Sequence, residues 1–321
     1  GCNVPAIMAT RTIENKNDRL VTMLIIPFMS CSARYPVYIL LISAFFTDYR
    51  GSLLFGIYIF GIVLAGMVAW ALKKTLFKAQ TVPFVMELPP YRMPVFTSVL
   101  KQTWFKAEQY LRKMGTIILV ASIVVWALGY FPLNKDIDQV YDQKIEVFTA
   151  QLPDNYQLAN DTVLVDSITK LNSLRLSKKQ ESSYIGIIGK FIEPAIQPLG
   201  FDWKMGIGII AGSAAKEIVI STLGVLYQTG DDIENNQLLV QKLQNQVYES
   251  GPKKGENVFT PLVALSFMLF ILIYFPCIAV VAAIKNESGK WKWSLFLTVY
   301  TTVLAYLISL ITFQLGSLLG F

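Results

Sequence analysis

Long apolar stretches dominate the chain and predict membrane-spanning helices. Four of them carry no charge and exceed the roughly 18–20 residues that cross a bilayer: 52–72, 114–134, 260–284 and 294–321. Two others are as long but contain charges: 20–47 holds Arg34, and 205–229 holds Lys216 and Glu217. We therefore expect an all-α, polytopic membrane bundle with about six transmembrane helices, some of them broken or re-entrant.

The chain has three cysteines, and each lies near a proline in or beside an apolar stretch: Cys2 near Pro5, Cys31 near Pro27, and Cys277 next to Pro276. Proline lacks a backbone N–H and frees carbonyls upstream of it. At membrane depth, such carbonyls are tolerated only where protein buries them or where they line a watery cavity. We predict helix breaks at Pro5, Pro27, Pro276 and Gly212. The neighbouring thiols suit a transition-metal ion better than sodium or a sugar.

An internal repeat is visible in the order of these features. Residues 1–10 align without gaps with residues 212–221, and a glycine and an isoleucine are identical. Each copy is followed by an apolar stretch that holds a proline and a cysteine, and then by a clean span. If the basic connections after 72 and after 284 are both cytoplasmic, the two copies run in opposite directions, as in many secondary transporters.

Composition divides the chain into five parts. Residues 1–74 hold the first copy of the repeat, and 75–113 form a basic connection that includes a proline-rich strap at 83–94. Its second half, 95–113, fits either an interfacial amphipathic helix or an ordinary connector. A transmembrane helix at 114–133 leads to a polar insertion at 134–183. Residues 184–321 hold the second copy and the final transmembrane helices, and 185–201 fits a re-entrant hairpin or an interfacial helix.

Composition also excludes several function classes. The 321 residues include no histidine, which removes the usual proton shuttle and any Ser-His-Asp or Cys-His pair. The net charge of +6 is concentrated between the spans and is no nucleic-acid signal. The glycines at 186–190 lack the spacing of a phosphate-binding loop, and Ser213 to Lys216 fits S-x-x-K without its partner motifs. We expect no enzyme activity, nucleotide site or nucleic-acid partner in this chain.

Charged residues inside apolar spans are costly unless they are paired or hydrated. Lys216 and Glu217 are neighbours that point in different directions on a helix, so each needs its own partner, and Arg34 is a candidate for Glu217. We predict that these three residues form gating charge pairs; a purely structural ion pair is the alternative. Ser30 beside Cys31 adds a hydroxyl ligand, with small-residue packing as its alternative. For Cys277 the alternative is a small buried hydrophobe.

Five motifs in collinear order resemble the membrane region of the bacterial ferrous iron transport protein B, FeoB. They are GCNVPAIMATR at 1–11, PFMSCSAR at 27–34, ELPPYR at 87–92, AAKE at 214–217 and PCIA at 276–279. The resemblance covers nearly the whole chain, apart from the polar segments 134–183 and 230–257. It implies two Gate modules, one ending near 74 and one over 184–321. The family's conserved cysteines match Cys2, Cys31 and Cys277.

The resemblance implies that the chain moves Fe²⁺ across the bacterial inner membrane as a multi-pass protein. Cys31 and Cys277 would bind the ion transiently near the midplane, with Cys2 at one mouth. The family also has an N-terminal, cytoplasmic GTP-binding domain, which would bring GTP and Mg²⁺ and drive or gate transport. Because the chain starts at Gly1 without Met or a signal pattern, we interpret it as a fragment that lacks this domain. Further partners implied are the lipid bilayer, a small FeoA-like protein and other copies in a homo-oligomer.

Two other classes compete with this interpretation. A Gate-type nucleoside or small-solute carrier would place aromatic and amide groups around the midplane in place of thiols. A membrane scaffold without transport would leave Lys216, Glu217 and Arg34 without a role.

The charge distribution predicts the orientation of the chain. Between residues 73 and 113, eight Lys and Arg residues oppose two Glu residues, so this connection should be cytoplasmic and 134–183 periplasmic. Single cysteines introduced at Lys78 and at Asn155, in a cysteine-free background, should react with impermeant maleimides from opposite sides of the membrane. Labelling of both positions from one side would contradict this topology.

Overall fold

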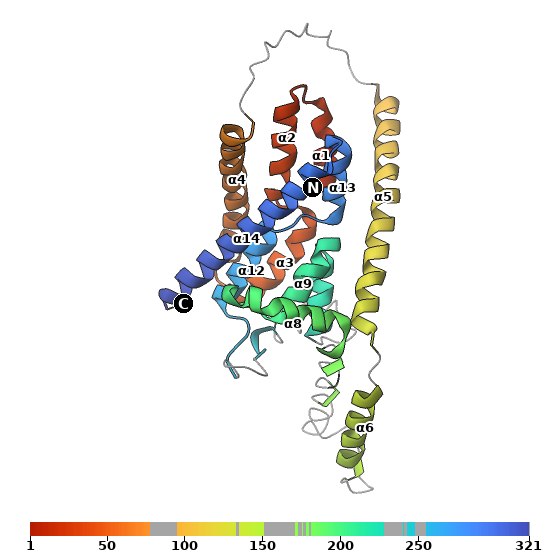
Figure 1. Ribbon diagram of the computed structural model, residues 1–321, viewed down its shortest axis with the longest axis vertical. Coiled ribbons are helices and arrows are strands. Elements are labelled where there is room, and N and C mark those ends of the chain that lie inside the picture. The colour runs from red at the N-terminus through yellow and green to blue at the C-terminus, as the bar shows by residue number, and fades with distance from the viewer. Residues whose placement is uncertain are drawn as a thin grey trace.

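The computed structural model describes residues 1–77, 95–132, 135–150, 171–172, 175, 178–179, 181–227, 240, 243–247 and 255–320. Apart from turns and one isolated bridge between Val247 and Asn257, these residues are helical, which confirms the all-α prediction. The proline-rich strap at 83–94 and most of the insertion at 134–183 lie outside the described residues. The α-helices are α1 (Asn3–Ala9), α2 (Lys16–Ile25), α3 (Tyr35–Phe45), α4 (Arg50–Thr75), α5 (Phe96–Tyr130), α6 (Lys135–Ala150), α8 (Tyr184–Ile196), α9 (Trp203–Ala214), α10 (Ile218–Leu226), α12 (Pro261–Ile273), α13 (Ile278–Ser288) and α14 (Trp291–Leu318) (Figure 1).

Four helical segments are long and apolar enough to cross a membrane, as the sequence predicts for these parts of the chain: Lys16–Phe45, Arg50–Thr75, Pro261–Ser288 and Trp291–Leu318. The span expected at 114–134 belongs to α5, a continuous helix of 35 residues that also includes most of the segment 95–113. Such a helix is about 52 Å long and exceeds a hydrocarbon core of about 30 Å. The span expected at 205–229 consists of two shorter helices, α9 and α10.

The two proline-broken spans run in opposite directions. In Figure 1 the chain passes from α2 near the top to α3 below it, whereas it passes from α12 in the lower half up to α13. The 3-10 helices η2 (Ile26–Phe28) and η3 (Ser32–Arg34) lie at the first break, between α2 and α3. The second break, between α12 and α13, covers residues 274–277. This antiparallel relation is the one expected of an inverted repeat.

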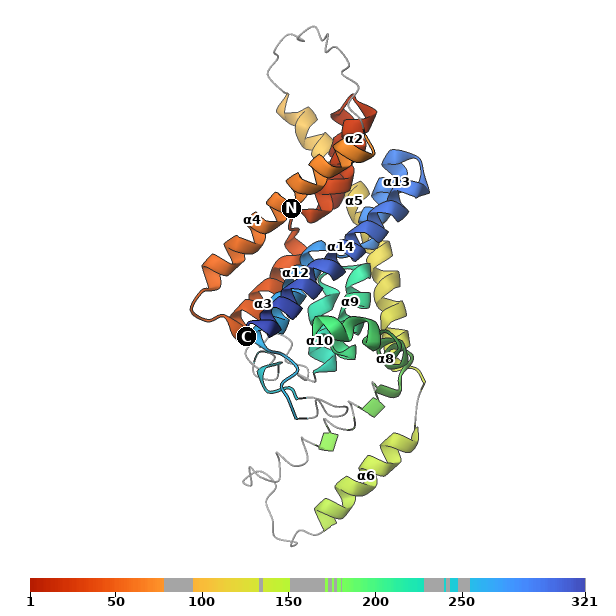
Figure 2. The same cartoon turned by 60° about the vertical axis from the view of Figure 1, so that its left-hand side comes forward.

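Local sequence signals determine where several helices begin and end. Asn15, Ser183, Asp202 and Thr260 each accept a hydrogen bond from a backbone N–H in the first turn of α2, α8, α9 and α12. These side chains satisfy donors that a helix start leaves free. The segment 185–201 is α8 followed by the 3-10 helix η4 (Gln197–Leu199) and a turn at Gly200, whose φ of 82° favours glycine. The chain then returns as α9, which packs on α8 (Figure 2).

Helix α14 packs on its neighbours through small residues and hydrogen bonds as well as through apolar side chains. One row of large apolar side chains recurs every four residues on its exposed face: Leu295, Val299, Val303, Leu307, Ile311 and Leu315. Its fully buried residues are Leu297 and the small or hydroxyl residues Ser294, Thr301, Ala305 and Ser309. Ser309 Oγ donates to the Ser266 carbonyl of α12 at 3.1 Å, and Ser266 Oγ donates to the Ser309 carbonyl at 3.2 Å. Small residues and interhelical hydrogen bonds are the usual means of packing helices in lipid.

The glycines of α4 differ in what they do. A Cβ on Gly61 would lie 2.9 Å from the Phe28 carbonyl oxygen, so this glycine lets α4 approach the first helix break. Gly56 and Gly66 have open space around them. Of the four glycines in α4, Gly61 alone has a neighbour within the described residues that is close enough to exclude a Cβ.

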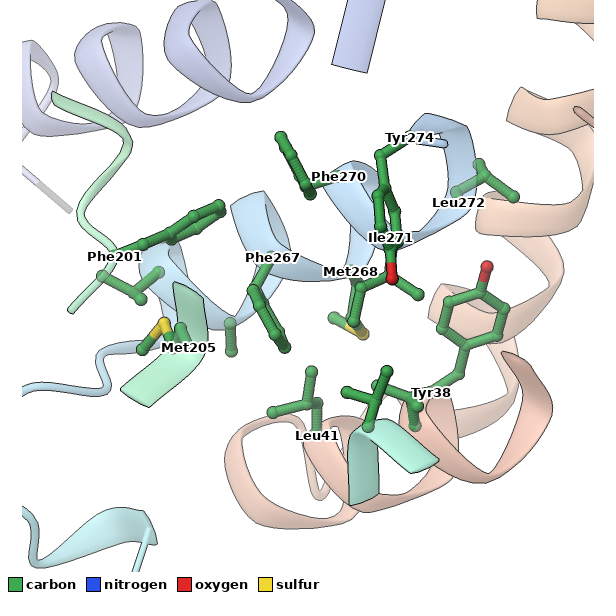
Figure 3. Packing of buried hydrophobic residues seen from close by; sticks show 14 of the residues in the cluster. Tyr38, Leu41, Phe201, Met205, Phe267, Met268, Phe270, Ile271, Leu272 and Tyr274 are labelled. Atoms are coloured by element: carbon green, nitrogen blue, oxygen red, sulfur yellow. The ribbon is translucent and has the colours of Figure 1, made fainter. Parts of the chain in front are cut away.

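Two groups of buried side chains lie above and below the breaks. The larger one is built mainly from α3 and α12 with residues of α4 and α10, and Figure 3 shows part of it, with Phe201, Met205 and Phe267 toward one end and Tyr38 and Tyr274 at the other. The smaller one joins α1, α2, α13 and the start of α14, and Cys2 and Cys277 pack at its edge. The helix breaks lie where these two groups meet.

A buried carboxylate ties the two copies of the repeat together. Glu287, at the end of α13, has a side chain that is only 4% exposed. It accepts hydrogen bonds from Arg11 Nε at 2.7 Å and from an Arg19 guanidinium nitrogen at 2.8 Å. Arg11 lies in the 3-10 helix η1 (Thr10–Thr12) that follows α1, and Arg19 lies on α2. The end of α13 is thereby attached to the first copy.

The Glu287 cluster should contribute measurably to stability. Glu287→Gln keeps the shape but removes the charge that two guanidinium groups share, so we expect a loss of about 1–3 kcal/mol. The readout is the apparent melting temperature of the detergent-purified protein. The control is Asp18→Asn, which breaks the exposed Lys73–Asp18 pair at 2.8 Å. It should lower the free energy of unfolding by no more than about 1 kcal/mol. Equal melting temperatures for Glu287→Gln and the parent would contradict the expectation.

Candidate functional site

The three helix breaks and the start of α1 surround one cavity of about 90 Å³. A water molecule needs roughly 10–15 Å³ by this measure, so the cavity has room for several waters or a partly hydrated ion. Its wall comes from four places in the sequence: Cys2, Asn3 and Val4; Cys31, Ser32, Ala33 and Arg34; Ala214, Ala215, Lys216 and Glu217; Pro276, Cys277, Ala279 and Val280. We call it the central cavity.

All three cysteines line the central cavity, each from the residue that precedes a helix. Cys2 is the N-cap residue of α1, Cys31 that of η3, and Cys277 that of α13. Cys2 and Cys31 have extended backbone, Cys277 has φ −58° and ψ 151°, and none of the three is in a disulfide. The fold therefore brings together, from positions up to 275 residues apart, the three soft ligands that the sequence singled out.

Lys216 lies in the break between α9 and α10. Ala215 has extended backbone, with φ −150° and ψ 136°, and ends α9. The Lys216 side chain is 3% exposed, and its Nζ donates to the carbonyl oxygen of Phe275 at 2.7 Å. The same ammonium lies 3.1 Å from the ring centroid of Tyr274, a close cation–π contact. Lys216 thus satisfies the Phe275 carbonyl, which lies in the non-helical break between α12 and α13 and so has no place in a helical hydrogen-bond ladder.

Arg34 performs the corresponding task at the first break. Its side chain is 1% exposed, and Nη1 donates to the Pro27 carbonyl at 2.9 Å and to the Met29 carbonyl at 3.5 Å. The described residues contain no ion pair between Arg34 and a carboxylate. The suggested pair with Glu217 is therefore not formed, because the guanidinium binds the backbone carbonyls of its own break.

Glu217 has a different environment from its neighbour Lys216. It is exposed and lines the central cavity, where it is the only carboxylate among the lining residues within the described chain. No ion pair to Glu217 occurs in that part of the structure. The cavity wall thus combines two buried cations, one accessible carboxylate and three thiols.

The remaining predicted residues lie outside the cavity wall. Pro5 does not break a helix: it lies in the first turn of α1, where proline fits because that N–H has no intrahelical partner. Gly212 lies inside α9, three residues before the break, and a Cβ there would overlap Val219 and the Tyr274 hydroxyl. Pro27 lies in η2 at the first break, and Ser30 is half-buried beside Cys31 without lining the cavity.

Three functional groups were missed by the sequence analysis. Asn3 is 8% exposed and adds an amide to the cavity wall. The Tyr274 ring and the Phe275 carbonyl hold the Lys216 ammonium. A signal for Phe275 existed, because the residue before a helix-interrupting proline has a carbonyl close to the break. No pattern in the chain indicates that Lys216, nearly 60 residues away, reaches it.

The described cavity wall does not form a preassembled metal cage. Among the described residues, no three Cys, Asp or Glu side chains are close enough to hold a metal ion together. Helix starts carry partial positive charge, and Lys216 and Arg34 add two basic side chains. A divalent cation is therefore stable here only when thiolates or Glu217 compensate this charge, and binding to a thiol releases its proton.

These features define the class: a polytopic helical membrane protein with a thiol-lined cavity at the breaks of its spans. Residues 111–291, more than half of the chain, match the Gate family, described as "Nucleoside recognition", and residues 54–106 match the family described as "Ferrous iron transport protein B C terminus". The chain belongs to the FeoB family, as the C-terminal membrane region that carries the Gate domain.

Curated relatives agree along the whole chain. A Fe(2+) transport protein A/Fe(2+) transporter FeoB fusion protein of Porphyromonas gingivalis is 51% identical over 99% of this chain and 37% of its own length. The Fe(2+) transporter FeoB of Campylobacter jejuni is 40% identical over 99% of the chain and 45% of its own length. The chain therefore spans less than half of these relatives. No solved structure matches it.

Proposed function

We propose that this chain forms the membrane path of a ferrous iron transporter, with the central cavity as its transit site. The observation that carries the proposal is the convergence of Cys2, Cys31 and Cys277 on one cavity at the helix breaks. The names of the relatives, which are Fe(2+) transporters, support the same substrate.

Transport needs a site that binds an ion and releases it again. Thiolates provide soft ligands, Glu217 and Asn3 provide hard oxygen ligands, and the breaks provide carbonyls. Because no three acidic or thiol groups meet within the described residues, the ion exchanges ligands as it passes and does not remain in a closed cage. In a closed cage of four cysteines, by contrast, zinc is held as a structural element.

Further parts of the proposal concern the whole protein. The chain lies in the bacterial inner membrane, with the first Gate module over 1–74 and the second over 184–321. The connection 75–113 is cytoplasmic and the insertion 134–183 is periplasmic. An N-terminal domain that binds GTP and Mg²⁺ gates or drives transport, this chain itself catalyses no reaction, and other copies form a homo-oligomer. A FeoA-like partner is supported by the fusion protein of Porphyromonas gingivalis.

A nucleoside or small-solute carrier is the competing proposal, because the matching Gate family is described as "Nucleoside recognition". A nucleoside site needs aromatic surfaces for the base and several amide groups. The described cavity wall has one amide, Asn3, and no aromatic side chain, but it has three thiols. This composition favours a metal ion.

The thiols should be required for uptake. Serine is nearly isosteric with cysteine but is a harder and weaker ligand for Fe²⁺. Because even the loss of an outer-shell partner typically lowers metal affinity about 10–100-fold, we expect at least a roughly tenfold fall in Fe²⁺ uptake for Cys31→Ser and Cys277→Ser. Cys2→Ser, at one mouth, should have a smaller effect. The measurement is uptake by proteoliposomes that contain the full-length transporter, with melting temperatures as the control for folding.

The outcome of the double variant decides this point. If Cys31→Ser/Cys277→Ser carries Fe²⁺ at the parental rate, the thiols only pack and the proposed path is wrong.

Glu217 should attract the cation without contributing to stability. It is exposed to the cavity, so Glu217→Gln should change the folding free energy by no more than about 0.5 kcal/mol. The same substitution should reduce Fe²⁺ uptake severalfold, mainly through a higher KM, because the cavity loses its accessible carboxylate. Glu256→Gln, at an exposed glutamate outside the cavity, is the matched control. Normal uptake together with a lowered melting temperature would show that Glu217 is structural.

A further inference from the structure

The side chain of Lys216, a residue that lines the central cavity, occupies a cation-binding arrangement formed by Phe275 and Tyr274, neither of which lines the cavity. A carbonyl oxygen lies 2.7 Å from Nζ on one side, and the face of the Tyr274 ring lies 3.1 Å away on the other. A carbonyl oxygen and an aromatic face are both groups that attract a cation. The Lys216 side chain is almost completely buried, so the ammonium has exchanged its water shell for these two groups.

Lys216 differs from Arg34 in a way that matters for movement. Arg34 binds two carbonyls of its own break with a planar, rigid guanidinium; they belong to residues seven and five positions earlier in the chain. Lys216 instead reaches from the α9–α10 break to the α12–α13 break, and the described chain shows one acceptor for its three donors. Its flexible four-carbon stem lets the ammonium leave the carbonyl while its backbone stays in place.

We propose that Lys216 is a tethered cation that occupies the ion site between transits, and that the Phe275 carbonyl is the ligand over which it competes with the metal. This inference rests on the proposed function, since it takes the central cavity as the metal path. An ammonium and a divalent ion repel each other strongly at short range, so both cannot bind one carbonyl oxygen.

The competition gives the cavity two alternating states. In the resting state the ammonium satisfies the Phe275 carbonyl, which would otherwise be a buried acceptor without a partner. When Fe²⁺ arrives at Cys277, two residues further along the chain, it takes the carbonyl and the ammonium withdraws into the cavity. The return of the ammonium then lowers the affinity for the ion and promotes its release.

The proposal predicts that removing the ammonium tightens metal binding. Anaerobic titration of the full-length transporter with Co²⁺, followed by thiolate-to-cobalt charge-transfer absorption, measures the affinity. Lys216→Met keeps most of the length of the side chain without its charge. This variant should bind Co²⁺ at least about tenfold more tightly than the parent protein. The same variant should transport Fe²⁺ more slowly, because release loses its competitor.

Lys204→Met is the matched control. Lys204 is another buried lysine, 6% exposed, whose ammonium lies 5.0 Å from the ring centroid of Tyr227 and which does not line the cavity. Its substitution should leave the Co²⁺ affinity unchanged. If Lys216→Met binds Co²⁺ as the parent does, or more weakly, the competition is refuted.

A second measurement keeps the test decisive if Lys216→Met folds poorly. Lys216→Ala leaves space for a small alkylammonium ion, so added methylammonium should weaken Co²⁺ binding to this variant competitively and leave the parent unaffected. Absence of such competition in a folded Lys216→Ala protein would overturn the proposal.

Failure of the proposed function looks different. If Cys31→Ser/Cys277→Ser keeps the parental charge-transfer signal and affinity, the cavity is not the metal site, whatever Lys216→Met does. If the thiol variants lose the signal but Lys216→Met binds no more tightly, the metal path stands and only the role of Lys216 falls.

Discussion

The structure depends on how backbone carbonyls are satisfied where proline interrupts a helix inside the membrane. In lipid an unpaired carbonyl costs several kcal/mol, so a broken span exists only if other groups replace the missing hydrogen bonds. Here two buried basic side chains supply these hydrogen bonds. Arg34 donates to the carbonyls of Pro27 and Met29, and Lys216 donates to the carbonyl of Phe275. A neutral donor could satisfy these oxygens equally well. The use of charged donors makes the same place electropositive and so determines which ligands a metal site there must have.

This electrostatic setting explains why thiols and a carboxylate share the cavity with two cations. Without Cys2, Cys31, Cys277 and Glu217, the cavity would repel any metal cation. When ionisable ligands compensate a charge surplus, the metal affinity depends on pH, because each thiol that binds gives up its proton. Such a balance suits an ion in transit better than a neutral cage of preformed ligands.

Much of the fold follows from sequence patterns that act locally. Uncharged apolar stretches predict α4, α12 and α14, and prolines predict the breaks at 27 and 276, because a missing N–H has the same effect in any context. Pro5 shows the limit of this argument, because its effect depends on whether the helix begins before or after it. The gathering of the cysteines around one cavity could be expected from the repeat. The partners of Lys216 and Glu287 could not, since they depend on how distant helices pack.

The Glu287 contacts have a consequence for how the molecule can move. The sequence repeat divides the chain between its two copies, but α13 of the second copy is bound to η1 and α2 of the first through Arg11 and Arg19. Cys2 begins α1 and Cys277 begins α13, so these contacts join the helices of two cavity thiols across the boundary between the copies. A shift of α13 against the first copy would therefore have to break the Glu287 contacts before it could separate those two thiols.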